Sequence, residues 1–268
     1  MVSVQDVDLF VDEIGAGVPL LMMHGLGLDH VSLRRFHDPL ASVARLVFYD
    51  HRHNGRSGRT GPADHATWHA DAIALLDQLN IGRAVLYGHS YGAWLALGCA
   101  LRYPDRVSGL VLCGSSPAFD YVPDVIAAAQ AKDPMLAAFL INGLSAPVES
   151  DEAFERLWRT ILPLYFRGPV RPDILDGITF SARAFAAGMQ CLQSFSVVDQ
   201  LPSMKMPILL VNGAHDFITP AKQAKRIADG APNARLVELT DSGHFPFAEQ
   251  PVAYLTAIRD WLRSARPW

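Results

Sequence analysis

The sequence has few features of membrane, nucleic-acid-binding or disulfide-bonded proteins. Its 268 residues contain three cysteines, Cys99, Cys113 and Cys191, an odd number without metal-ligand spacing, so we expect reduced core residues. The formal net charge is −4 and no cluster of lysine and arginine is present, which argues against a nucleic-acid partner. The longest apolar stretch, residues 84–101, is broken by three glycines and two polar residues, so we expect no membrane span.

The first residues also lack the pattern of a secretion signal. Residues 1–6 contain neither a positively charged segment nor an apolar one, and a signal peptide combines both. Together with the isolated cysteines, this predicts a cytoplasmic protein. No repeat, low-complexity tract or linker interrupts the chain, and its length suits one core with an insertion.

Short apolar runs alternate with helical segments along most of the chain. The runs that predict strands are 7–14, 19–23, 45–49, 84–87, 107–112, 207–213 and 235–239, and the segments that predict helices are 30–43, 64–80, 93–101, 220–229 and 251–263. Strands that alternate with helices favour the α/β class, with a mainly parallel sheet and helices on both faces.

The alternation stops in one long stretch. We expect an α/β core formed by residues 1–117 and 200–268, and a helical lid (cap) over residues 118–199. The aromatic and methionine side chains of this stretch fit either the lid's own core, which we expect for most of them, or the wall of an apolar pocket. They are Phe119, Tyr121, Met135, Phe139, Phe154, Trp158, Tyr165, Phe166, Phe180, Phe185 and Met189.

Residues 88–92 read Gly-His-Ser-Tyr-Gly and lie between a predicted strand and a predicted helix. A chain that turns from strand to helix at a single residue strains that residue, and side chains two positions to either side would collide. The two glycines therefore suit a nucleophile elbow, which exposes the hydroxyl of Ser90 above the sheet. Taken alone, the motif also fits a glycine-rich turn whose serine caps the helix.

Two further reactive side chains follow predicted strands, where ligands bind in open α/β sheets. Asp216 follows the strand over 207–213, and His244 follows the last predicted strand. An imidazole can remove a serine proton near neutral pH, and a buried carboxylate on its other nitrogen stabilises the imidazolium. The pattern predicts a catalytic triad of Ser90, Asp216 and His244, although Asp216 alone also fits a helix N-cap. Asp241 is too close in sequence to His244 to reach around its ring.

These motifs and their order resemble the α/β-hydrolase superfamily over essentially the whole chain. The resemblance implies a Ser-His-Asp serine hydrolase in which the backbone N–H groups of Leu26 and Tyr91 form the oxyanion hole. It also implies structural roles for His24 and His89. The other matching segments are His24-Gly25-Leu26-Gly27, the loop from Asp50 through Arg52 to Gly55-Arg56-Ser57, and Ser242-Gly243-His244.

One position departs from the pattern of the superfamily. Its loop usually reads Asp-x-Arg-Gly-x-Gly-x-Ser, and this chain has His53 at the first of these glycines. We expect a changed loop conformation there, with His51 and His53 as solvated residues at the rim of the pocket.

An apolar pocket under a lid suits esters with apolar acyl groups. The predicted enzyme is a carboxylesterase that also accepts acyl lactones, such as N-acyl homoserine lactones, through an acyl-enzyme on Ser90. The alternatives are a prolyl aminopeptidase, a carbon–carbon bond hydrolase and a non-catalytic ligand receptor on the same fold. The carboxylates that an aminopeptidase requires are present over residues 149–155, where they resemble the start of a solvated helix.

The expected partner is therefore a small-molecule ester or lactone, and neither nucleic acid nor a membrane. No metal or organic cofactor is implied, because the predicted mechanism uses side chains and backbone N–H groups alone. The sequence gives no indication of the oligomeric state.

Overall fold

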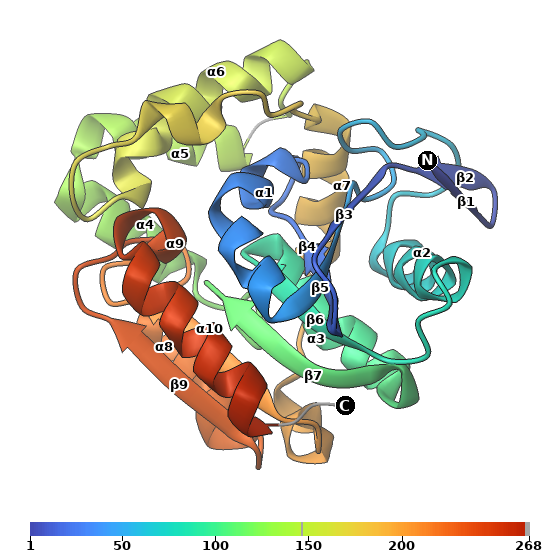
Figure 1. Cartoon of the computed structure of the whole chain (residues 1–268). Coiled ribbons are helices and arrows are strands. Elements are labelled where there is room, and N and C mark those ends of the chain that lie inside the picture. The colour runs from blue at the N-terminus through green and yellow to red at the C-terminus, as the bar shows by residue number, and fades with distance from the viewer. Residues whose placement is uncertain (146, 266–268) are drawn as a thin grey trace.

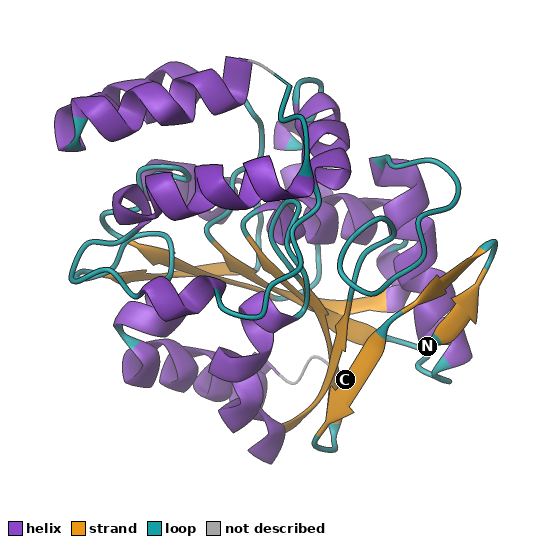
Figure 2. Cartoon of the chain, turned by 90° about the horizontal axis from the view of Figure 1, so that it is seen from above, coloured by secondary structure: helices purple, strands orange, loops and turns teal. Residues whose placement is uncertain are grey.

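A seven-stranded sheet crosses the middle of the molecule (Figure 1). The computed structural model describes residues 1–145 and 147–265. The strand order is β3-β5-β4-β6-β7-β8-β9, and all neighbouring strands run parallel except β3 and β5. Helices lie on both faces of the sheet (Figure 2). The predicted fold class is therefore confirmed.

The strands of this sheet are short and mostly apolar. Every residue of β6, β7 and β8 is buried, as expected for parallel strands that are covered on both faces. The bounds are β3 Val11–Ile14, β4 Val18–Met23, β5 Ala44–Tyr49, β6 Ala84–His89, β7 Val107–Cys113, β8 Ile208–Gly213 and β9 Ala234–Leu239.

The single strand predicted over residues 7–14 is wrong. β2 (Val7–Leu9) pairs with β1 (Val2–Val4) in a separate two-stranded antiparallel sheet, and β3 begins only at Val11. Between them, the backbone N–H of Phe10 donates to Oγ of Ser57 (2.8 Å) rather than to a neighbouring strand. This contact with a distant loop divides the run.

The predicted core helices form, with one break. The helix expected over 30–43 ends at His37 and continues as the 3-10 turn η1 (Asp38–Ser42), because Pro39 has no N–H to extend the helix. None of the described helices is long and apolar enough to cross a membrane. The helices are α1 Val31–His37, α2 His65–Gln78, α3 Tyr91–Arg102, α8 Ala221–Gly230, α9 Pro246–Glu249 and α10 Pro251–Ala265.

The chain between β7 and β8, residues 114–207, is called the inserted segment below. Its described residues form helices, 3-10 turns and loops, and an antiparallel bridge between Ala118 and Ser196 brings its two ends together. Its helices are α4 Val122–Lys132, α5 Pro134–Ser145, α6 Asp151–Ile161 and α7 Ala182–Leu192, and its 3-10 turns are η3 Leu162–Tyr165, η4 Pro172–Leu175 and η5 Val198–Ser203.

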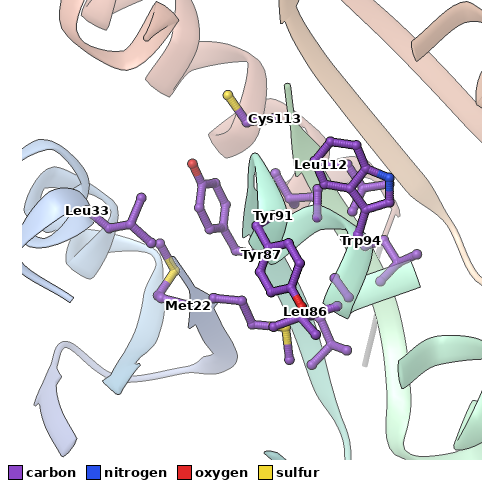
Figure 3. Close-up of a cluster of buried hydrophobic side chains, with 14 of the residues drawn as sticks. Met22, Leu33, Leu86, Tyr87, Tyr91, Trp94, Leu112 and Cys113 are labelled. Carbon is purple, nitrogen blue, oxygen red and sulfur yellow. The ribbon is translucent and has the colours of Figure 1, made fainter. Parts of the chain in front are cut away.

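The core packs on both faces of the sheet. Figure 3 shows the buried Leu86 and Leu112 of β6 and β7 on the side of Trp94 of α3, whereas the buried Met22 of β4, which pairs with Tyr87, lies on the other face near Leu33 of α1. Packing of this kind fixes the strand ends that carry the site. Of the cysteines, Cys99 and Cys113 are buried as predicted, whereas Cys191 on α7 is only partly buried.

Candidate active site

Ser90 lies at the sharp turn between β6 and α3. Its backbone angles, φ 53° and ψ −124°, fall in a region that side-chain-bearing residues rarely adopt. Its N–H donates to the carbonyl of Cys113 in β7 (2.8 Å), which holds the strained residue in place. A Cβ at Gly88 would collide with the carbonyl of Gly92, and a Cβ at Gly92 would collide with the carbonyl of Met23. The glycines are therefore required by close backbone approach, as the sequence indicates.

Asp216 and His244 meet at the ends of two neighbouring strands, β8 and β9. Nδ1 of His244 lies 2.8 Å from Oδ2 of Asp216, and both side chains are buried. Asp216 is not the N-cap of α8, because that helix begins at Ala221 after Pro220. Its carboxylate instead accepts hydrogen bonds from the N–H and hydroxyl of Thr219 (2.9 and 2.5 Å), which fix its orientation.

The loop of His244 is held by backbone contacts on both sides. The N–H of His244 donates to the carbonyl of Tyr165 in the inserted segment (2.8 Å), and Nε2 of His89 donates to the carbonyl of His244 (3.0 Å). His89 therefore has the structural role that the resemblance implies. With Nδ1 directed at Asp216, Nε2 of His244 has no hydrogen-bond partner among the described residues, so it is available for a proton transfer.

Ser90 and His244 line the same cavity. The structure places no hydrogen bond between the Ser90 hydroxyl and another described side chain, His244 included. Catalytic hydrogen bonds are often long without substrate and shorten when it binds. Of the predicted triad, Asp216 and His244 are therefore hydrogen-bonded to each other, and Ser90 lies on the wall of the cavity that His244 also lines.

The two predicted oxyanion donors lie beside the serine. A Cβ at Gly25 would come within 3.9 Å of the Cβ of Ser90, so the Gly25–Leu26 turn lies directly against the elbow. Leu26 and Tyr91 both line the cavity. Within the described residues, neither backbone N–H donates to an acceptor. Two unpaired N–H groups at one cavity can bind a developing oxyanion.

The cavity is apolar and has a volume of about 100 Å³. Among the described residues, no aspartate, glutamate, lysine or arginine lines it. Most of the aromatic and methionine side chains of residues 118–199 pack in the hydrophobic core or against it, as expected, but most of these also form the wall of the cavity. Phe119, Tyr121, Phe154, Trp158, Tyr165, Phe185 and Met189 line the cavity, and Met135 and Phe139 are exposed.

His24 connects the Gly25–Leu26 turn to the loop that begins after β5. Its Nδ1 donates to the carbonyl of Gly25 (2.9 Å) and its Nε2 accepts the N–H of His51 (3.1 Å). Burial lowers the pKa of His24 to about 4, so the ring is neutral at pH 7. This is the structural role that the resemblance implies.

The expectation of rim positions for His51 and His53 is wrong. Both side chains are buried, and neither lines the cavity. The ring of His51 stacks on that of His24, with 3.8 Å between centroids, and Nε2 of His53 hydrogen-bonds to the carbonyl of Gly61 (3.0 Å). His53 has φ 69°, the left-handed conformation that glycine favours, so the loop keeps a glycine-like backbone around a buried imidazole.

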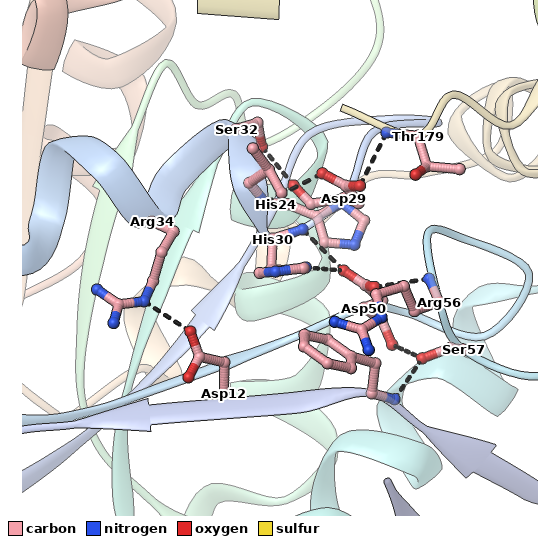
Figure 4. Close-up of polar contacts among 12 residues, drawn as sticks. Asp12, His24, Asp29, His30, Ser32, Arg34, Asp50, Arg56, Ser57 and Thr179 are labelled. Carbon is pink, nitrogen blue, oxygen red and sulfur yellow. Dashed lines mark hydrogen bonds and ion pairs between the residues drawn. The ribbon is translucent and has the colours of Figure 1, made fainter. Parts of the chain in front are cut away.

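A buried polar cluster that includes Asp29, His30 and Asp50 lies close to the Gly25–Leu26 turn in the chain (Figure 4). Oδ1 of Asp50 accepts both the N–H and Nδ1 of His30 (2.8 Å each), and Oδ2 of Asp29 accepts the N–H of Thr179 in the inserted segment (2.8 Å). Burial opposes charge here, yet the hydrogen bond raises the pKa of His30 and lowers that of Asp50, which favours an ion pair. These atoms are near enough to share a metal ion, but each already bonds to protein, so we assign none.

Thr219 and Tyr165, which contact Asp216 and His244, are not among the catalytic or oxyanion-hole residues that the sequence predicts. Thr219 follows Asp216 by three residues, a spacing typical of an Asp-capped turn, and this signal was available. Tyr165 contacts His244 through its backbone carbonyl, which no side-chain pattern reveals.

Comparison with known proteins places this architecture in a family. Residues 18–251 match the family described as alpha/beta hydrolase fold, so the chain belongs to it and is a hydrolase of that class. Over 254 residues it is 31% identical to a pimeloyl-(acyl-carrier protein) methyl ester esterase of Aromatoleum aromaticum, covering 91% of this chain and 98% of that protein.

Two further similarities show the range of the family. The chain is 26% identical over 261 residues to a 2-hydroxymuconate semialdehyde hydrolase of Pseudomonas, covering 94% of this chain and 89% of that protein. Among solved structures, a thermophilic esterase from Thermogutta terrifontis, with malate bound, matches with a TM-score of 0.73 and 26% identity, covering 97% of this chain and 94% of that one.

Proposed function

We propose that the protein hydrolyses carboxylic esters through an acyl-enzyme on Ser90. The observation that carries the proposal is the buried hydrogen bond of 2.8 Å between Asp216 and His244, at the cavity that Ser90 lines. A buried carboxylate on Nδ1 fixes the histidine tautomer and stabilises the imidazolium, which is the arrangement that activates a serine. Similarity to the methyl ester esterase supports the same reaction class.

The reaction follows from the positions of these groups. Nε2 of His244 takes the proton of the Ser90 hydroxyl as the serine oxygen attacks the acyl carbonyl. The oxyanion forms at the N–H groups of Leu26 and Tyr91, each worth about 3–4 kcal/mol in the transition state. His244 then protonates the leaving alcohol, and a water molecule activated by the same imidazole releases the acid from Ser90.

The walls of the cavity favour a neutral acyl group. A charged group in an apolar site is costly unless a partner of opposite charge is present. No described lysine or arginine lines the cavity to receive a carboxylate, such as that of 2-hydroxymuconate semialdehyde. In the part of the chain that the structure describes, no aspartate or glutamate lines it to receive the ammonium of an aminopeptidase substrate, because the carboxylates of residues 149–155 lie elsewhere. Esters and lactones with neutral acyl groups fit best.

The walls of the cavity suit an apolar acyl chain, because aromatic and aliphatic side chains form most of them. Residues 118–199 act as the lid in this proposal, since their aromatic side chains form much of the wall and their two ends meet at the Ala118–Ser196 bridge.

A panel of p-nitrophenyl esters of increasing chain length, together with acyl lactones and proline arylamides, tests the proposal. We expect turnover of esters with apolar acyl chains and none of the arylamides, and the panel gives the preferred chain length. Ser90→Ala should remove activity by at least about 10⁴-fold. An active Ser90→Ala variant, or ligand binding by the wild-type protein without turnover of any ester or lactone, would refute it, and the second result would favour a receptor.

A further inference from the structure

Besides the hydrogen bond between His244 and Tyr165, the inserted segment is connected to the loop of His244 by the carboxylate of Glu249, at the end of α9. We call this connection the Glu249 bridge. Oε2 of Glu249 accepts the N–H of Gly243 (2.6 Å), the residue directly before His244. Oε1 accepts the N–H groups of Arg167 and Gly168 in the inserted segment (2.7 and 2.9 Å). One carboxylate therefore connects the histidine loop to the segment that covers it.

The segment that Glu249 contacts is also held from its other side. Lys132 of α4 donates to the carbonyl of Leu164 (2.9 Å) and to the carbonyl of Phe166. Between these groups, the carbonyl of Tyr165 accepts the N–H of His244 (2.8 Å). The backbone over residues 164–168 is thus bonded to the histidine loop directly and through Glu249.

The contact between the two stretches leaves little free space. A Cβ at Gly243 would collide with the carbonyl of Tyr165, so the two backbones are packed against each other. An ionised carboxylate accepts hydrogen bonds at both oxygens, and bonds to an ionised acceptor are about twice as strong as neutral ones. A neutral amide at this position has a single acceptor oxygen and would direct its NH₂ group at one set of N–H donors.

We propose that Glu249 is a positioning residue that holds the Gly243–His244 backbone against residues 165–168 and so sets the position of the His244 imidazole relative to Ser90. This role rests on the proposed function, because it matters only if His244 moves protons to and from Ser90. His244 acts in both acylation and deacylation, and a displacement of about 1 Å can lower a rate by about 100-fold. Glu249 itself contacts neither Ser90 nor the cavity.

The test compares Glu249→Gln with a matched variant on the same loop. Gln250 accepts the N–H of Asp241 (3.0 Å) and the hydroxyl of Ser242 (2.8 Å), but makes no hydrogen bond to the described residues of the inserted segment. Gln250→Ala therefore removes loop contacts without removing the bridge. We would measure kcat and KM for p-nitrophenyl acetate and p-nitrophenyl hexanoate, and count active sites by titration with a p-nitrophenyl phosphonate.

For Glu249→Gln we expect kcat per titrated site to fall by about tenfold for both esters, with KM changed less than about twofold. Gln250→Ala should keep kcat within about twofold of wild type. Three outcomes would overturn the proposal. Equal losses in the two variants would indicate loop stability instead of imidazole position, and a change confined to KM of the hexanoate would indicate lid shape. Unchanged kcat in Glu249→Gln would indicate that Glu249 does not set the position of the imidazole.

Glu249→Asp keeps the charge and shortens the side chain, and serves if Glu249→Gln does not fold. Because the shorter carboxylate cannot bond to both sides of the bridge, kcat per site should again fall for both esters alike, and wild-type kcat would overturn the proposal. A wild-type protein that hydrolyses neither ester would refute the proposed function, whereas active wild type with unaffected variants would refute the role of Glu249 alone.

Discussion

The sheet and the inserted segment are both rich in apolar side chains but bury them differently. In β6 and β7 each residue packs against other protein atoms, and Leu86 and Leu112 have no exposed surface. In the inserted segment, Trp158 and Phe185 face a cavity. Dense packing holds reacting groups at fixed positions, while side chains around a cavity determine what fits there. Under the proposed function, the first region supports catalysis and the second supports selection among substrates.

This difference can be tested by substitutions in each region. A change at the strand ends should lower the rate for every ester by the same factor. A change in the cavity wall of the inserted segment should instead alter the preference among esters. A substitution in either region that both lowers the rate for every ester and alters the preference among esters would show that the two regions do not have separate roles.

After Ser90→Ala, the largest effect is expected for Asp216, the carboxylate that bonds to Nδ1 of His244. Asp216→Asn keeps the shape of the side chain but favours the wrong histidine tautomer, and the corresponding change in serine proteases lowers kcat by about 10⁴-fold. We expect a loss of about 10³- to 10⁴-fold in kcat/KM for all p-nitrophenyl esters tested.

Asp241→Asn is the matched control for this substitution. Asp241 is exposed, three residues before His244, and its carboxylate does not contact the imidazole. Its kcat/KM should remain within about twofold of wild type. Equal losses at Asp216 and Asp241 would mean that neither acts as the specific partner of His244.

Acid should destabilise the sheet region, which contains buried neutral histidines that the inserted segment lacks. Burial lowers the pKa of His24 and of His37 to about 4, from about 6.5 in an unfolded chain. The unfolded chain then binds more protons between these values, so their contribution to stability is complete above pH 6.5 and is lost as pH falls to 4. Each of these two histidines contributes up to about 3 kcal/mol to the free energy of unfolding at neutral pH.

The measurement is urea-induced unfolding at pH 7 and at pH 4.5. Asp29, whose pKa burial raises to about 6, opposes the trend over the same range, so the net fall is smaller than the sum for the histidines. His37→Gln isolates one contribution, and its stability should depend less on pH than that of wild type. An identical pH dependence in the two proteins would contradict the assignment.

The features that sequence predicted well depend on local sterics and burial. Apolar runs, interrupted only by Arg45 in β5 and Ser108 in β7, mark β4, β5 and β7 because parallel strands covered on both faces favour apolar residues. The strained turn at Ser90 needs glycines two positions to either side, so the motif is readable without any knowledge of the fold.

The features that sequence did not predict depend on partners far along the chain. The imidazole of His53 is buried, and its Nε2 donates a hydrogen bond to the carbonyl of Gly61. The residues next to His53 in the sequence do not indicate this burial. Which side chains of residues 118–199 also line the cavity could not be predicted for the same reason. Phe154 and Phe185 sit at helical spacings that fit either role, and only the placement of their helices over the Ser90 elbow decides it.

The smallest effect is expected in the cavity wall of the inserted segment. Phe185 of α7 lines the cavity, and Phe139 of α5 is 48% exposed and does not. Phe185→Ala removes a ring from the wall, so we expect the ratio of kcat/KM for octanoate over butyrate esters to rise by about tenfold. Phe139→Ala, the same change at the same type of residue, should leave the ratio unchanged. A uniform loss of activity in Phe185→Ala, with no change in the ratio, would mean that this ring supports the catalytic groups and that selection of the acyl chain lies elsewhere.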